Sequence, residues 1–198
     1  MKSGTTARTV MIGTAVLIAL LLQVTVLPHF AWDVGSLAVV PDVVLLVVVA
    51  TALLTDARSG MLTGFFAGLL LDLAPPSDHP AGRWALALLS VGYVVGRLAH
   101  DHTSDPGRGA RLRRPPWLVT IAAAAGGSFV GISVYALTGL VLGDASIGVG
   151  EVLPVALAAL VLDLVAALLV VPATWWLLQR VAEDQAGPRV RQGTWART

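Results

Sequence analysis

Four ionisable side chains lie within or at the ends of long apolar runs, and they are the residues best placed to do chemistry in this chain: Asp42, Asp72, Arg83 and Asp163. Charged groups at such positions are costly, and they usually face protein or a water-filled cavity. Asp163 lies deepest, because it stands about eleven residues into its run, or roughly 16 Å at 1.5 Å per residue. Its carboxyl group must therefore be protonated, paired or open to a polar crevice.

Two roles are open for these groups. Asp163 either couples to transport or forms a hydrogen bond between helices, with Gln23 and Thr25 of the first run as candidate partners. The other three groups are expected on one side of the membrane, where the arginine would neutralise one of the two carboxylates. The alternative is that each of the three reaches the lipid headgroups separately.

A ladder of glycines precedes Asp72. Gly60, Gly64 and Gly68 recur every fourth residue in the segment GMLTGFFAGLLLD, and Asp72 takes the next step of the same register. On a helix this spacing gives a stripe of bare backbone that ends in a carboxylate. A soluble helix would lose about 1 kcal/mol per glycine, whereas a membrane helix can use the stripe for close packing. The segment therefore predicts a membrane helix that packs against a partner or, as we expect, against its own chain.

No residue pattern in the sequence indicates catalysis or metal binding. The chain has no cysteine, which excludes disulfides and thiolate metal sites, and no Gly-rich phosphate loop, nucleophile elbow or His-Glu-x-x-His motif. The sequence His100-Asp101-His102 lacks further ligands nearby. Ser90, Ser128 and Ser133 have no histidine base within a predicted span. We therefore predict no catalytic residues, no cofactor, no metal and a non-enzymatic function.

The composition predicts an all-α integral membrane protein. Hydrophobic residues make up 56% of the chain and charged residues only 13%, about half the charged share of a typical soluble domain. Six apolar runs predict six transmembrane helices in a single membrane domain, at about 10–27, 37–54, 60–74, 84–98, 118–142 and 152–178. A spanning helix needs about 20 apolar residues. The third and fourth runs are shorter, which implies local thinning of the bilayer or burial among neighbours.

The basic residues predict the orientation of these helices. With a cytoplasmic N-terminus and six spans, twelve of the thirteen lysines and arginines lie inside and only Arg83 lies outside, as the positive-inside rule expects. Tryptophans near the ends of the runs then fall at the two membrane interfaces. They are Trp32 and Trp84 outside, and Trp117, Trp175 and Trp176 inside. Both termini are therefore predicted to be cytoplasmic.

Two basic segments lie outside the apolar runs. Residues 99–117 are predicted to form a cytoplasmic loop near anionic lipids, and residues 179–198 a flexible tail; neither pattern favours nucleic-acid binding. At the other end, Lys2 and Arg8 precede an apolar run, as in a signal peptide. The run is about 18 residues long and no clear cleavage site follows it, so we expect an uncleaved first helix.

Three groups of residues together resemble one known family. Pro41-Asp42 opens the second run, Gly60-x-x-x-Gly64-Phe65-x-x-Gly68-Leu69-x-x-Asp72 follows, and Gly92-Tyr93-x-x-Gly96 comes one helix later. This combination resembles the rod shape-determining protein MreD family over the first hundred residues; the rest is similar only in topology and length. Structural or partner-binding roles are expected for Pro41, Asp42, Gly60, Gly64, Phe65, Gly68, Asp72, Gly92 and Gly96, and, from the charges alone, for Arg83 and Asp163.

The resemblance implies a scaffold in the bacterial inner membrane. Such a protein acts in cell shape and peptidoglycan synthesis by binding the bitopic protein MreC and, through it, the actin-like MreB and the peptidoglycan synthases of the elongation machinery. The family is also similar in fold to the substrate-binding subunits of energy-coupling-factor vitamin transporters. A six-helix solute-binding subunit is therefore the alternative function.

The functions differ in what they require of the structure. A solute-binding subunit needs a closed cavity of roughly a few hundred Å³ with converging polar groups, whereas a scaffold needs an exposed apolar helix face. A third possibility is a proton-coupled carrier built around Asp163 and Asp72. No internal repeat and no continuous row of ionisable groups supports that possibility.

Overall fold

Helices make up nearly all of the structure. The computed structural model describes residues 2–34, 37–75, 81–101, 115–142 and 149–186. The helices within these ranges are α1 (Lys2–Leu21), α2 (Val43–Leu54), α3 (Ala57–Leu73), α4 (Arg83–Asp101), α5 (Trp117–Val141) and α6 (Val149–Ala186). After α1 come a π-helical segment, Leu22–Val26, and a 3-10 segment, Leu27–Phe30. Two short antiparallel strands, β1 (Trp32–Val34) and β2 (Leu37–Val39), then lead to α2.

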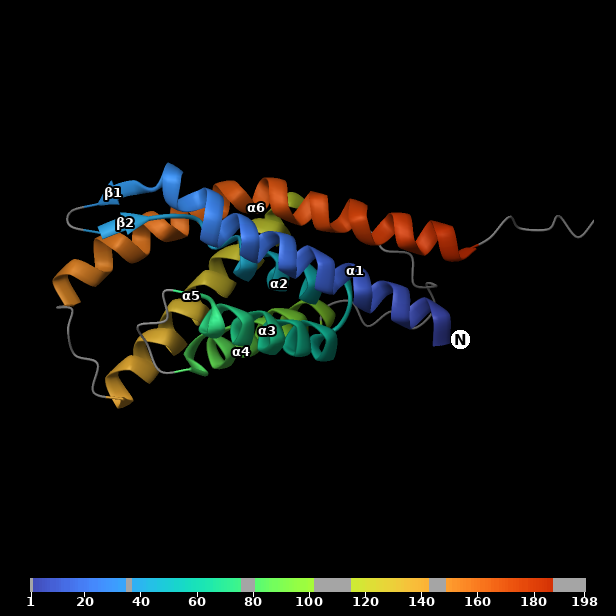
Figure 1. Ribbon diagram of the computed structural model, residues 1–198, viewed down its shortest axis with the longest axis horizontal. Helices are drawn as coiled ribbons and strands as arrows, with labels where there is room; N and C mark the ends of the chain where they lie inside the picture. The colour runs from blue at the N-terminus through green and yellow to red at the C-terminus, as the bar shows by residue number, and fades with distance from the viewer. Residues whose placement is uncertain (1, 35–36, 76–80, 102–114, 143–148, 187–198) are drawn as a thin grey trace, which may run out of the picture.

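Three of the described segments are long and apolar enough to cross a membrane: Thr6–Phe30, Trp117–Val141 and Leu153–Arg180. Val43–Leu54 is a shorter apolar helix. By the length and composition of these helices, the chain is a membrane protein. Figure 1 shows that the start of α1 and the end of α6 lie at the same end of the molecule, with the β1–β2 hairpin at the other.

The short helix α2 is the centre of the fold. It packs against all five other helices, and every side chain from Val44 to Ala52 is buried. Its twelve residues span only about 18 Å at 1.5 Å per residue, less than the roughly 30 Å of a bilayer's hydrocarbon core. The ends of α2 therefore lie within protein, and their backbone groups need partners from other parts of the chain.

The second predicted helix, at 37–54, is wrong in its first part. Residues Leu37–Val39 form strand β2, and the helix begins only at Val43. Pro41 restricts the residue before it to extended conformations and has no N–H for a helical bond. Asp42 then caps the helix, because its Oδ1 accepts a hydrogen bond of 2.9 Å from the backbone N–H of Leu45.

The other predicted helices differ from the structure mainly at their polar ends. The first begins at Lys2 instead of residue 10, the fourth reaches Asp101, and the sixth extends from Val149 to Ala186. Apolar runs mark only the part of a helix that is apolar, and the backbone hydrogen bonds continue into flanking polar residues. The predicted loop at 99–117 is shortened at both ends, and part of the predicted tail is helical. Residues 102–114 and 187–198 lie outside the described residues.

The glycine ladder faces α4. A Cβ atom added at any of the three ladder glycines would lie within 3.0 Å of a backbone carbonyl oxygen of α4. The oxygen belongs to Gly92 for Gly60, to Leu88 for Gly64 and to Trp84 for Gly68. As the residue numbers increase along α3, the numbers of the residues that they contact in α4 decrease, so the two helices are antiparallel. Gly92 and Gly96 meet α3 just as closely. The stripe predicted from spacing packs against its own chain, backbone against backbone.

Replacing Gly64 with alanine should therefore destabilise the protein. The new methyl group would overlap the Leu88 backbone, which cannot move as a flexible side chain can, and overpacking of this kind costs about 1–3 kcal/mol. The measurement is thermal unfolding of the full chain in detergent, followed by circular dichroism. Gly126→Ala is the matched control, because no atom lies within 4 Å of a Cβ added there. Equal melting temperatures for the two variants would contradict the proposed packing.

Candidate functional site

A network of polar groups surrounds the N-terminus of α2. The backbone N–H of Asp42 donates a hydrogen bond of 2.7 Å to Oδ1 of Asp163 in α6. The backbone N–H of Val44 donates one of 2.9 Å to Oε1 of Gln23, in the π-helical continuation of α1. The backbone N–H of Leu45 donates to the Asp42 side chain, so three backbone donors at the start of α2 are bonded to side-chain acceptors. The first turn of a helix leaves such donors free.

Asp163 joins three helices. Its Oδ2 accepts a hydrogen bond of 2.6 Å from the hydroxyl of Ser128 in α5, while its Oδ1 accepts from α2. The side chain is only 3% exposed. The carboxylate also lies at the positive end of the α2 dipole, which favours a negative group there. The arrangement is that of a helix cap supplied by a distant helix.

Asp163 thus forms the hydrogen bonds between helices that were one of its two expected roles. Its partners differ from those expected. Gln23 belongs to the same network but bonds the backbone of Val44, and Thr25 bonds the Leu21 carbonyl of its own helical segment. Ser128, one of the serines available as a nucleophile in the sequence, is instead a hydrogen-bond donor to Asp163. A buried hydroxyl on a glycine-rich helix face could have indicated a partner for a carboxylate elsewhere in the membrane.

Asp72 caps a second helix. Its two carboxylate oxygens accept hydrogen bonds from the backbone N–H groups of Gly82 (2.8 Å), Trp84 (3.1 Å) and Ala85 (3.1 Å) at the start of α4. Gly82 has a φ of 101°, a conformation that glycine adopts without steric cost. The last residue of the glycine ladder therefore ties the end of α3 to the beginning of α4.

Arg83 is buried against α5. Its Nη2 donates a hydrogen bond of 3.1 Å to the Tyr135 carbonyl oxygen, and its Cζ lies 4.0 Å from the centroid of the Tyr135 ring, within cation–π range. Gly139 leaves room for the guanidinium, since a Cβ there would lie 2.5 Å from Nη2. These contacts join Arg83 to α5, while its chain neighbours Gly82 and Trp84 donate hydrogen bonds to Asp72. Asp42 belongs to the separate network at Asp163.

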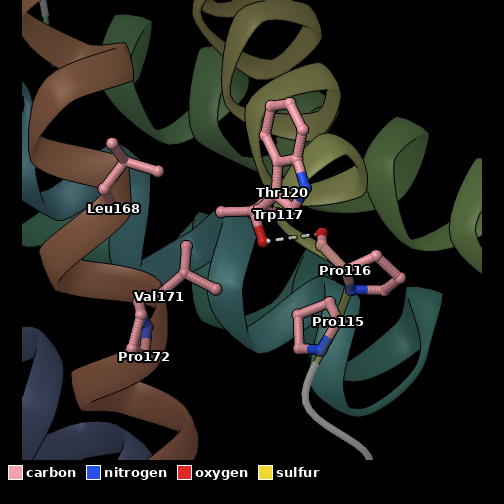
Figure 2. Close-up of a pocket in the computed structure, with 7 residues that line it drawn as sticks. All are labelled: Pro115, Pro116, Trp117, Thr120, Leu168, Val171 and Pro172. Atoms are coloured by element: carbon pink, nitrogen blue, oxygen red, sulfur yellow. Dashed lines mark hydrogen bonds between the residues drawn. The ribbon is translucent and has the colours of Figure 1, made fainter.

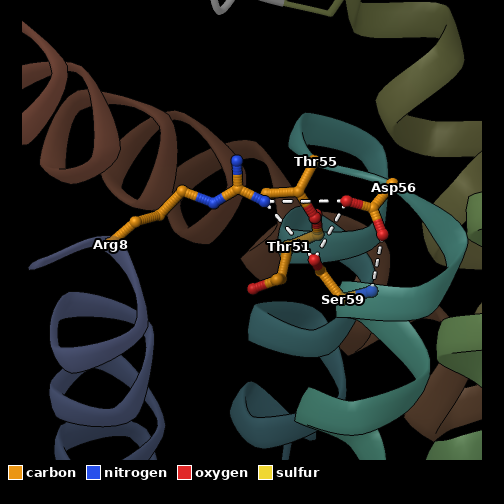
Figure 3. Close-up of polar contacts among 5 residues, drawn as sticks. All are labelled: Arg8, Thr51, Thr55, Asp56 and Ser59. Atoms are coloured by element: carbon orange, nitrogen blue, oxygen red, sulfur yellow. Dashed lines mark hydrogen bonds and ion pairs between the residues drawn. The ribbon is translucent and has the colours of Figure 1, made fainter. Parts of the chain in front are cut away.

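A second polar cluster lies at the junction of α2 and α3 (Figure 3). Asp56 caps α3 by accepting hydrogen bonds from the Ser59 N–H (2.7 Å) and the Ser59 hydroxyl (3.0 Å). Arg8 of α1 lies 3.7 Å from Oδ2 of Asp56 and donates a hydrogen bond of 3.3 Å to the Ser59 hydroxyl. No local sequence pattern indicates this cluster, because Arg8 and Asp56 are far apart in the chain. The contacts of Arg8 with Asp56 and Ser59 hold the first part of α1 against the junction of α2 and α3.

These contacts change the acidity of Asp56. Partial burial raises the pKa of its carboxyl group, but the hydrogen bonds from Ser59 and the positive charge of Arg8 together outweigh that effect and hold the pKa below its ordinary value. A lowered pKa means that the ionised form is bound more favourably in the folded protein.

One cavity lies between α5 and α6, near the start of α5 (Figure 2). Its volume is about 400 Å³. The lining residues are Pro115, Pro116, Trp117, Thr120, Leu168, Val171 and Pro172. The Thr120 hydroxyl donates to the Pro116 carbonyl, so the lining side chains offer mainly apolar surface.

The remaining candidate residues have structural positions in the described part of the chain. Pro41 accepts a hydrogen bond of 3.2 Å from the Val43 N–H just before α2. Phe65 lies on the outer face of α3, with its ring 5.4 Å from that of Phe66. Among the described residues no group of three or more His, Asp or Glu could hold a metal ion. No protein-family model matches the chain, and no curated protein or solved structure matches it.

Asp163→Ala should destabilise the protein more than Asp163→Asn. Alanine leaves the Asp42 N–H and the Ser128 hydroxyl without their acceptor in an apolar interior, at a cost of about 1–3 kcal/mol. Asparagine keeps the carbonyl oxygen for the backbone donor and can donate its amide to Ser128. Thermal unfolding of both variants in detergent measures the difference. Equal stability of the two variants would contradict the capping role.

The contribution of Asp56 to stability should depend on pH. Because the folded pKa is lowered, this contribution is present above the unfolded value of about 3.9 and is lost as the pH falls through the folded value. Urea or thermal unfolding of the wild type and Asp56→Asn between pH 7 and pH 3 measures it. The wild type should be the more stable at pH 7 and lose that advantage in acid. A pH-independent difference would contradict the lowered pKa.

Proposed function

We propose that this protein is a non-enzymatic scaffold of the MreD type in the bacterial inner membrane. In this proposal it has six spans with both termini in the cytoplasm. It binds an MreC-like bitopic protein, and through that partner it acts on the MreB filaments and peptidoglycan synthases that maintain rod shape. The proposal rests on the resemblance of residues 41–96 to that family, and on what these residues do in the structure.

One observation carries the proposal: the residues of the resemblance form a single packing unit. Asp42 caps α2, Asp72 caps α4, and the glycines bring the backbones of α3 and α4 together. The carboxylates that could have done chemistry are therefore used to hold helices in place. A structure whose buried polar groups satisfy backbone donors is suited to presenting a rigid surface, and this supports binding as the function.

The described cavity favours the scaffold over the solute-binding alternative. Its volume of about 400 Å³ is sufficient for a small ligand. A vitamin-type solute also needs several converging polar groups, and here the one lining hydroxyl, that of Thr120, already bonds Pro116. The alternating direction of the helices, with α1 starting and α6 ending at one end (Figure 1), supports an even number of crossings.

The outer face of α3 is the partner surface that this proposal selects. The inner face of the helix carries the glycines and meets α4. Phe66 is 59% exposed. Phe65, which is one of the residues that carry the resemblance to the MreD family, lies beside it and is also exposed. Aromatic side chains contribute much of the binding energy at protein interfaces. A transmembrane helix of the partner would pack its apolar side chains on this pair.

Co-purification with an MreC-like bitopic protein tests the proposal. The double variant Phe65→Ala and Phe66→Ala should lower recovery of the partner at least tenfold, since each aromatic anchor is worth on the order of 1 kcal/mol or more. Phe129→Ala is the matched control, because Phe129 is 71% exposed on α5 and should leave recovery unchanged. Failure of the wild type to retain the partner would contradict the function. Equal recovery with the double variant would contradict the choice of surface.

A further inference from the structure

The cavity between α5 and α6 is chemically suited to an alkyl chain. Three of its lining residues, Pro115, Pro116 and Pro172, are prolines, which have no backbone N–H to donate. Leu168 and Val171 supply the aliphatic wall on α6, and Figure 2 shows them on the helix that faces Trp117 and the two prolines that precede α5. Few hydrogen-bond donors therefore point into the space, and burial there favours hydrocarbon over a polar solute.

A cationic group follows the cavity along α6. Leu168 and Pro172 line the cavity, and Trp176 and Arg180 follow at the same four-residue spacing, which turns about 40° around the helix at each step. The Cζ atom of Arg180 lies 3.7 Å from the centroid of the Trp176 ring. Arg180 is eight residues beyond Pro172, or about 12 Å along the helix, and it ends the apolar segment Leu153–Arg180.

Tryptophans lie both at the cavity and beside the arginine. Trp117 is 65% exposed at the start of α5, where the apolar segment Trp117–Val141 begins, and Trp176 is exposed one turn before Arg180. Tryptophan is enriched at the headgroup level of membranes. The apolar cavity, with Trp117 on its wall, thus lies next to the part of α6 that carries Trp176 and Arg180.

We infer that this face of α5 and α6 is a binding site for one anionic phospholipid. An acyl chain occupies the cavity, and the phosphate of the headgroup pairs with Arg180 beside the Trp176 ring. One cationic group beside the cavity favours a lipid of net negative charge over a zwitterionic lipid. Arginine suits a phosphate through its planar, bidentate donors.

The size of the cavity distinguishes a lipid chain from a partner's helix. A helix is about 10 Å across, so a single turn of it already fills about 400 Å³, which is the whole volume of the cavity. A partner helix would therefore have to lie outside it. This site is separate from the outer face of α3 and does not depend on the proposed scaffold function.

Native mass spectrometry of the full chain, purified in detergent and titrated with phosphatidylglycerol or phosphatidylcholine, tests the site. We expect one phosphatidylglycerol to be retained in preference to phosphatidylcholine. Leu168→Trp should lower that retention at least fivefold by filling the cavity. Leu169→Trp is the matched control, because Leu169 is the next residue, is 75% exposed and does not line the cavity; it should bind as the wild type does.

Arg180→Gln tests the headgroup contact without altering the core. It should reduce retention of phosphatidylglycerol about fivefold, the effect of one basic group near an anionic surface, and leave phosphatidylcholine unchanged. The helical content of each variant, measured by circular dichroism, verifies that it is folded. Equal retention of the two lipids by the wild type would overturn the inference, as would normal phosphatidylglycerol binding by folded Leu168→Trp or by Arg180→Gln.

Discussion

The structure depends on satisfying the backbone donors at the start of α2. In an apolar surrounding, each unsatisfied N–H costs several kcal/mol, and water cannot supply the missing partner. Asp163 and Gln23 provide acceptors from α6 and from the continuation of α1, while Asp42 provides one locally. A central helix that is too short to reach the interface therefore fixes the relative positions of the helices around it. The fold is organised by capping as much as by apolar packing.

The same use of carboxylates recurs at α4, where Asp72 accepts from three backbone N–H groups. At both sites a side-chain carboxyl group accepts hydrogen bonds from the backbone N–H groups that the first turn of a helix leaves without partners. This explains how two aspartates are accommodated in apolar segments.

Features that depend on local spacing could be predicted from the sequence, and features that depend on distant pairing could not. The glycine ladder predicted close helix packing, and apolar runs located all six helices. A hydrogen bond from Asp163 to another helix is one of the roles that the sequence predicts. Its partner, the Asp42 N–H, could not be predicted, because the two residues are 121 positions apart in the chain. Pro41 could have indicated that α2 begins after it and not at residue 37. Nothing local indicates that Arg8 and Asp56 contact each other, because they lie 48 positions apart in the chain.

The backbone contact between α3 and α4 has a consequence for biogenesis. Neither helix is among the three segments long and apolar enough to cross a membrane alone, and their glycines expose peptide groups that lipid solvates poorly. Paired, the two helices cover those groups, and Asp72 joins them across a short connection. We therefore expect α3 and α4 to leave the translocon together as a preassembled hairpin, and not as two helices that partition into lipid one after the other.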